Sequence, residues 1–109
     1  MGKPVAGDVV VLPFPQTNLH AGKRRPALVV TNLAGDDLIL CQITSQPRPD
    51  GHSISLADAD FKKGKLAVAS FARANRLFTV EQSVILYVAA QVSASKLGEV
   101  KTRIRALFA

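Results

Sequence analysis

The chain has 109 residues, 48% of them hydrophobic, and its single cysteine, Cys41, excludes an intrachain disulfide. This length predicts one domain over residues 1–109 with enough apolar material for a core, and no run approaches the ~18 residues of a membrane span. The net charge of +6, from 14 basic against 8 acidic residues, favours a polyanionic partner, although many basic proteins simply have a solvated surface. Without an apolar signal segment at the N-terminus, we expect a soluble cytoplasmic protein.

Short apolar runs separated by turn residues occupy the first 92 positions, a rhythm typical of a small β-sandwich or barrel. The expected strands are 9–12, 27–31, 38–44, 52–56, 65–72 and 84–92. The second and third are apolar on successive residues, which predicts strands covered on both faces. Because proline cannot donate to a strand ladder, Pro13 and Pro15 are expected to end the first strand.

The segments between these runs are predicted loops and turns. Residues 16–24 form a loop that is polar and then basic, residues 45–50 form another, and residues 60–64 form a turn. The Thr-x-x-Gln spacing of Thr79 and Gln82 is typical of a capping box and predicts one helical turn there.

A helix closes the chain, beginning at Ser93 or Ser95. Its apolar face is predicted from helical spacing to hold Leu97, Val100, Ile104, Leu107 and Phe108, with Lys96, Glu99, Lys101, Arg103 and Arg105 on the other face. The predicted fold is mainly β, a small barrel of five to seven strands with a C-terminal α-helix.

The common catalytic patterns are absent from the sequence. His20, His52 and one cysteine have no zinc-site spacing, there is neither a Gly-rich phosphate loop nor a Gly-x-Ser-x-Gly motif, and the aspartates lie in predicted turns. We therefore expect no metal or other cofactor. Any chemistry should use arginine, histidine, hydroxyl groups and the substrate itself.

The densest polar cluster runs from His20 to Pro26 and includes Lys23, Arg24 and Arg25. It is either a solvated basic loop or a functional site. Arg25 precedes a proline at the mouth of a buried strand, which restricts its backbone, and His20 lies five residues upstream. A planar guanidinium suits phosphate oxygens and an imidazole titrates near neutrality, so the two side chains form a candidate site.

Two further polar groups have alternative interpretations. Thr44-Ser45-Gln46 ends the third expected strand, where a hydroxyl either caps a turn or contacts a ligand. Arg73 and Arg76 flank Asn75 near the end of the fifth expected strand. They are either ligand-binding groups or edge charges that discourage aggregation.

Three segments of the chain occur in a particular order and spacing: residues 7–11 (Gly-Asp-Val-Val-Val), 23–30 (Lys-Arg-Arg-Pro-Ala-Leu-Val-Val) and 42–46 (Gln-Ile-Thr-Ser-Gln). Together they resemble the MazF/PemK family of toxin endoribonucleases. The pattern of a PemK-like subgroup continues through Asp60-Phe61, Gly64, Leu66, Ser70, Arg73 and Leu77-Phe78-Thr79, so the likeness covers nearly the whole chain. It implies an SH3-like barrel, usually a homodimer, with metal-independent cleavage of single-stranded RNA. It also implies a cognate antitoxin protein that blocks the RNA groove.

The resemblance implies roles for individual residues. The family's arginine before proline falls on Arg25, expected to clamp the scissile phosphate, and its strand-end threonine falls on Thr44, expected to position it. Two acids found in relatives, one aligning with His20 and one near Ser70, are absent, which makes His20 the candidate acid or base. The expected RNA contacts are Lys23, Arg24, Ser45, Gln46, Ser70, Arg73 and Arg76, and Phe14 or Phe71 is either a stacking partner or a core residue.

The implied reaction is attack of the RNA 2′-hydroxyl on the adjacent phosphorus, giving a 2′,3′-cyclic phosphate and a 5′-hydroxyl. Two alternatives remain open: a gyrase-poisoning toxin of the same barrel fold, and a catalytically inactive RNA-binding module. The gyrase-poisoning type acts through aromatic residues at its extreme C-terminus, notably tryptophan. This chain has no tryptophan and ends Ala-Leu-Phe-Ala, which counts against that alternative.

Overall fold

The computed structural model describes residues 3–14 and 23–109, except for the side chain of Phe14. Its strands are β1 (Asp8–Phe14), β2 (Lys23–Asn32), β3 (Asp37–Thr44), β4 (Ser53–Leu56), β5 (Phe61–Lys63), β6 (Ser70–Glu81) and β7 (Tyr87–Val92). Two 3₁₀ turns, Asp58–Asp60 and Gln82–Val84, and one helix, α1 (Ala94–Ala106), complete this part of the chain. The predicted mainly-β fold of five to seven strands with a C-terminal helix is confirmed.

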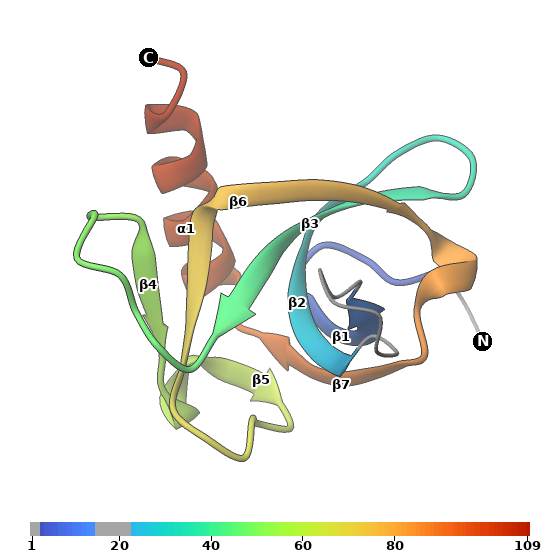
Figure 1. Cartoon of the computed structure of the whole chain (residues 1–109), viewed down its shortest axis with the longest axis horizontal. Coiled ribbons are helices and arrows are strands. Elements are labelled where there is room, and N and C mark those ends of the chain that lie inside the picture. Colours follow the sequence, from blue (N-terminus) through green and yellow to red (C-terminus); the bar gives the residue numbers. More distant parts are fainter. Residues whose placement is uncertain (1–2, 15–22) are drawn as a thin grey trace.

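All strands form one antiparallel sheet in the order β4-β6-β3-β2-β1-β7-β5. The sheet curls strongly, so that β6 and β7 pass on opposite sides of β1 and β2, while α1 stands beside β4 and β6 (Figure 1). None of the helices in the described part of the chain has the length and apolar character needed to span a bilayer.

The central strands bury side chains on both faces of the sheet. Alternate residues of β1, β2 and β3 enter two apolar clusters because successive side chains on a strand point to opposite faces. Leu28, Val30, Cys41 and Ile43 belong to the cluster that α1 covers. The other cluster includes Val10, Leu12, Ala27, Val29, Leu38 and Leu40. The predicted coverage of the second and third strands on both faces is confirmed.

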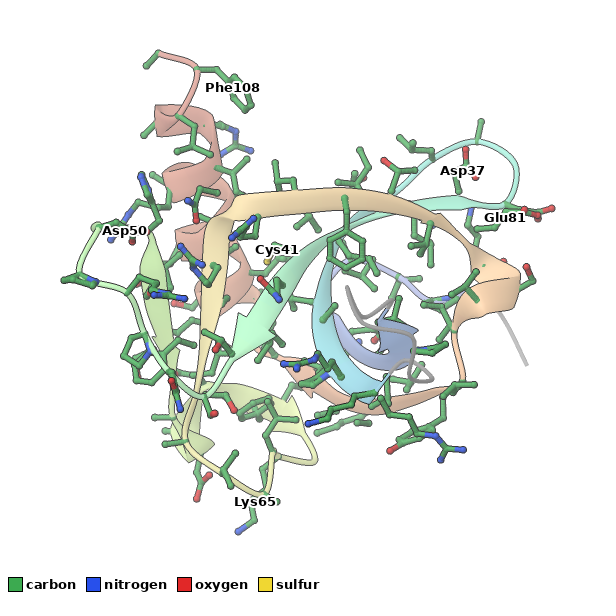
Figure 2. The ribbon with its side chains drawn as sticks, viewed as in Figure 1. Asp37, Cys41, Asp50, Lys65, Glu81 and Phe108 are labelled. Carbon is green, nitrogen blue, oxygen red and sulfur yellow. The ribbon has the colours of Figure 1, made fainter. Side chains whose placement is uncertain are left out.

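Helix α1 begins where the sequence predicts. The Ser93 Oγ accepts a hydrogen bond of 3.1 Å from the Lys96 backbone N, which caps the helix. Val100 is fully buried, and Leu97 and Ile104 pack against the same cluster. The prediction for Phe108 is wrong: the helix ends at Ala106, and Phe108 lies beyond it with 79% of its surface exposed (Figure 2).

Two expected boundaries in the first strands are wrong for reasons of pairing. Strand β1 continues through Pro13 to Phe14, because its pairing with β7 ends at Val11 and leaves no ladder bond there for a proline to lose. Strand β2 begins at Lys23 rather than Ala27. The basic residues Lys23, Arg24 and Arg25 thus lie on a strand and not in a loop.

Three expectations further along the chain are also wrong. The predicted turn at 60–64 contains the short strand β5, and the strand expected from Lys65 begins only at Ser70. Thr79 forms no helix start, because β6 extends to Glu81 in register with β3. Long-range pairing outweighs the local capping pattern, and a 3₁₀ turn follows from Gln82.

Candidate functional site

One face of the sheet carries the apolar cluster that includes Leu38 and Leu40, and it is called the inner face hereafter. Along β2 and β3 this face changes from apolar to polar. On β3 the buried Leu38 and Leu40 are followed at the same two-residue spacing by Gln42 and Thr44. On β2, Arg25 lies two residues before the buried Ala27. The end of this face therefore presents polar groups on a rigid strand framework.

These polar groups line a cavity of about 390 Å³, hereafter the arginine cavity. Its volume lies near the lower end of the roughly 300–1,000 Å³ typical of ligand sites. The described residues that line it are Arg25, Gln42, Thr44, Ser45, Gln46, Arg48, Arg73 and Arg76. Four of them are arginines and none is acidic, which favours an anionic ligand such as a phosphate.

A second cavity of about 340 Å³, the lysine cavity, adjoins the first. Its described lining consists of Lys23, Arg24, Arg25, Pro26, Ile43, Thr44, Ser45, Val68 and Ser70. Arg25, Thr44 and Ser45 line both cavities and so form their shared wall. An extended anionic chain crossing this wall would meet cationic groups on both sides.

Thr44 performs the turn-capping role that was one alternative from the sequence. Its Oγ1 accepts a hydrogen bond of 3.1 Å from the Gln46 backbone N. The hydroxyl approaches the Gln46 carbonyl oxygen only at 3.4 Å, so its proton is weakly engaged. The capping bond orients Thr44 at the shared wall and leaves its O–H able to donate to a ligand.

Arg73 lies within β6 rather than near the end of a strand, which corrects the expected position. It pairs in register with Gln42 of β3 and Ser53 of β4, and is only 8% exposed. Its Nη2 donates a hydrogen bond of 2.8 Å to the Asp50 Oδ2. A surface edge charge is therefore the wrong interpretation for Arg73.

The pKa of the Asp50 carboxyl lies below its ordinary value of 3.8. The hydrogen bond from the His52 backbone N to Oδ1, 3.0 Å long, is the largest cause, and the Arg73 guanidinium lowers the pKa further. Asp50 is therefore ionised at neutral pH and is a charged partner for Arg73.

An irregularity in β6 places Arg76 beside Arg73. On β3, Cys41 and Gln42 are adjacent, yet their partners on β6 are Leu77 and Arg73. The three intervening residues form a bulge, which changes the direction of the strand and interrupts its alternation. Both arginines consequently line the arginine cavity.

A third cavity of about 510 Å³, the apolar cavity, continues from the arginine cavity. It is lined mainly by apolar side chains, and its described lining is Leu12, Pro13, Gln42, Arg76, Leu77, Phe78, Val80 and Val84. Gln42 and Arg76 also line the arginine cavity, and they form the junction between the two. Apolar walls with an amide at the entrance suit a planar ring that carries hydrogen-bonding edges.

Four other predicted site residues remain, namely Ser70, Phe71, His20 and Phe14. Ser70 lines the lysine cavity but is 4% exposed, and its Oγ donates a 2.9 Å hydrogen bond to the Val68 carbonyl oxygen. Phe71 lines a separate cavity beside Ser55 and Lys65 and does not line the arginine cavity. His20 and the Phe14 side chain lie outside the described residues.

Gln42 and Arg48 also line the arginine cavity, although neither was predicted from the sequence to be a site residue. Each had a detectable signal. Gln42 is a polar residue inside the otherwise apolar run from Leu38 to Ile43, and Arg48 stands between two prolines, three residues after Ser45.

Cys41 contributes no chemistry to this site. It is fully buried in the cluster beneath α1, and burial raises the pKa of its thiol to about 12. Cys41 behaves as a small hydrophobic residue. Among the described residues, no group of three or more histidine, cysteine or acidic side chains is arranged to hold a metal ion.

The fold and cavities define a class of small basic β-protein with an arginine-lined face. Residues 6–108 match the family described as PemK-like, MazF-like toxin of type II toxin–antitoxin system. Since this match covers nearly the whole sequence, the chain belongs to that family. A sequence comparison with curated proteins returned no match.

Solved structures with the same fold include toxins of this family. A MazE–MazF complex (Form-III) of Deinococcus radiodurans matches at 25% identity with a TM-score of 0.79, covering 98% of this chain and 97% of that one. MazF alone (Form-I) from the same organism matches at 25% identity and 0.76, covering 99% and 98%. An endoribonuclease from a mycobacterial species, at 15% identity and 0.73, covers 99% and 93% and shares the fold.

Proposed function

We propose that this protein is a toxin endoribonuclease that cuts single-stranded RNA selectively and without a metal ion. The observation that carries the proposal is the arginine cavity, in which four arginines and the Thr44 hydroxyl surround a space for an anion. Family membership adds the expectation of toxin activity. In the reaction the RNA 2′-oxygen attacks the adjacent phosphorus while the bond from phosphorus to the 5′-oxygen breaks. The 2′-hydroxyl gives its proton to a base and the leaving 5′-oxygen takes one from an acid, which yields a 2′,3′-cyclic phosphate and a 5′-hydroxyl.

In this mechanism the scissile phosphate lies at the shared wall of the two cavities. The Arg25 guanidinium stabilises the charge that develops on the phosphoryl oxygens, and the Thr44 hydroxyl donates a hydrogen bond that orients them. A fixed donor to such charge contributes about 10²–10³-fold in rate. His20 is proposed as the general acid or base, a role worth about 10²–10⁴-fold.

The adjoining cavities suggest a path for the RNA strand. Lys23 and Arg24, with Ser70 nearby, hold phosphates on one side of the shared wall, since they line the lysine cavity. On the other side the arginine cavity offers Ser45, Gln46, Arg73 and Arg76. The apolar cavity takes a flanking base, and Gln42 at its entrance reads that base by hydrogen bonding, which would supply sequence selectivity.

We also propose a cognate antitoxin and a homodimer in the cytoplasm. Antitoxin binding is supported by family membership and by similarity to MazF of a MazE–MazF complex. A homodimer would cover apolar side chains that are exposed in the single chain. Among them are Leu86, directly before β7, and Tyr87 and Val88 on β7. Sedimentation at micromolar concentration should give about twice the 11.6 kDa chain mass.

The test is incubation of a long single-stranded RNA with the purified protein in EDTA. We expect cleavage with cyclic-phosphate ends, and no cleavage of a substrate with 2′-deoxy at the scissile nucleotide. Loss of activity on chelation, restored by Mg²⁺, would overturn the metal-free mechanism. Binding without cleavage would instead identify an RNA-binding module, and inhibition of gyrase without RNA binding would identify the other alternative.

A further inference from the structure

Asp50 contacts the arginine cavity indirectly, through one of its lining residues. Its Oδ2 accepts the 2.8 Å hydrogen bond from Arg73, and its Oδ1 accepts the 3.0 Å hydrogen bond from the His52 backbone N. Both carboxylate oxygens therefore have defined partners. The Asp50 side chain is 35% exposed, and its ion pair joins it to the Arg73 side chain, which is only 9% exposed.

The segment that carries Asp50 is tied to the sheet and to the helix. The Ala74 backbone N donates a 3.0 Å hydrogen bond to the His52 carbonyl oxygen, which joins the segment to β6. The Arg103 Nη1 of α1 donates to the Gly51 carbonyl oxygen. Asp50 is thus held from two sides, and its position can determine that of the Arg73 side chain.

The Arg73 guanidinium is buried but only partly satisfied. Asp50 accepts from Nη2, whereas the buried Nε has no acceptor among the described residues. A guanidinium has five N–H donors, and leaving buried donors unpaired costs about 1–3 kcal/mol each. The surrounding structure holds this group in place, and Arg73 also lines the arginine cavity, where an anionic ligand would bind.

We propose that Asp50 is a positioning residue, which fixes the Arg73 guanidinium at the arginine cavity so that its free N–H groups meet an RNA phosphate. This inference rests on the proposed function. A guanidinium fixed in this way stays aligned as charge develops on the phosphate in the transition state. Asp50 touches Arg73 and not the RNA, so its effect is indirect.

Removing the charge of Asp50 is expected to have two opposite effects, one on RNA binding and one on turnover. Removing one carboxylate changes the net charge from +6 to +7, which strengthens non-specific attraction to RNA. Loss of positioning instead slows turnover, since a displaced Arg73 no longer meets the phosphate. Tighter or equal binding combined with slower cleavage is therefore the signature of a positioning role.

The test compares Asp50→Asn with Asp37→Asn in single-turnover cleavage at saturating RNA. Both variants gain the same charge, but Asp37 lies at the far side of the molecule (Figure 2), paired in register with Glu81, so its removal relieves a like-charge pair. We expect the cleavage rate of Asp50→Asn to fall by at least ~10-fold, with binding equal or tighter. Asp37→Asn should cleave as the wild type does, and Asp50→Glu should recover part of the rate. Equal rates for Asp50→Asn and Asp37→Asn would overturn the proposal.

A second measurement does not depend on RNA cleavage. The NMR order parameter of the Arg73 Nε–H bond should be high in the wild type and in Asp37→Asn, and low in Asp50→Asn. An Arg73 side chain equally rigid in all three proteins would overturn the positioning role, even if RNA is cut. A wild type that cuts no RNA but shows this difference would overturn the proposed function while leaving the role of Asp50 in holding Arg73 supported. Circular dichroism establishes that each variant is folded.

Discussion

Arg73 and Arg76 lie three residues apart on β6 and line the same cavity. In a regular strand, side chains three residues apart point to opposite faces. The bulge between Arg73 and Leu77 breaks the alternation and brings both guanidinium groups to the inner face. The concentration of positive charge at this site thus depends on the bulge in β6.

Arg25→Ala should reduce kcat by at least ~10²-fold, whereas Arg24→Ala should leave kcat unchanged and weaken binding. The two neighbours have the same charge, but Arg25 lines both basic cavities and Arg24 lines only the lysine cavity. Arg24→Ala should also lower the slope of log K against log salt by about 1. Single-turnover kinetics at several salt concentrations check both effects, and Arg25→Lys should restore only part of the rate. Equal, modest effects of the two alanine variants would show that Arg24 and Arg25 act alike, as part of a basic surface on β2, and would contradict a catalytic role for Arg25.

Gln42→Met should change the base preference of cleavage without abolishing it. The substitution keeps the side-chain length but removes the amide at the junction with the apolar cavity, and a lost neutral hydrogen bond costs about 0.5–1.5 kcal/mol, or roughly 2–10-fold in discrimination. Sequencing the products from a random RNA pool measures the preference. Gln46→Met is the control, because Gln46 lines only the arginine cavity. If both variants keep the wild-type preference, the apolar cavity does not read a base.

The coupling between Asp50 and Arg73 should stabilise the fold at neutral pH and disappear in acid. Since the pKa of Asp50 is lowered on folding, its stabilisation is present above the ordinary pKa of 3.8 and is lost as pH falls through the folded value. A double-mutant cycle with Asp50→Asn and Arg73→Met, followed by urea unfolding from pH 7 downwards, measures this coupling. A coupling that is the same at pH 7 and at pH values below the folded pKa would contradict the ion pair.

Alanine substitutions of two glycines should have opposite effects on stability. Gly64 has a φ of +65°, and a Cβ there would lie 2.9 Å from the Ala89 carbonyl oxygen of β7, so Gly64→Ala should lower the free energy of unfolding by about 1–3 kcal/mol. Gly98 lies within α1 with no atom in the way, and Gly98→Ala should raise it by about 0.5–1 kcal/mol. Thermal and urea unfolding check the two signs. Destabilisation by Gly98→Ala would contradict this prediction, since no atom of the single chain would contact the added methyl group.

Much of the architecture was predictable because it depends on local patterns. Successive apolar residues indicated strands buried on both faces, and Ser93 with the helical spacing of Leu97, Val100 and Ile104 indicated the terminal helix. The boundaries that failed were decided by pairing with distant strands. Thr79 is the clearest case, since its partner Ile39 lies on a strand forty residues earlier.

The sequence by itself determined the family, the mainly-β fold and most of the residues of the candidate site, because apolar periodicity and short motifs are local properties of the chain. Only the tertiary structure decided that Arg25, Thr44, Arg73 and Arg76 line one cavity, and that Asp50 holds Arg73. Those relationships depend on register, on a bulge and on the meeting of the β3–β4 loop with β6. Such contacts between distant segments leave no periodicity in the sequence, and only packing of the whole chain creates them.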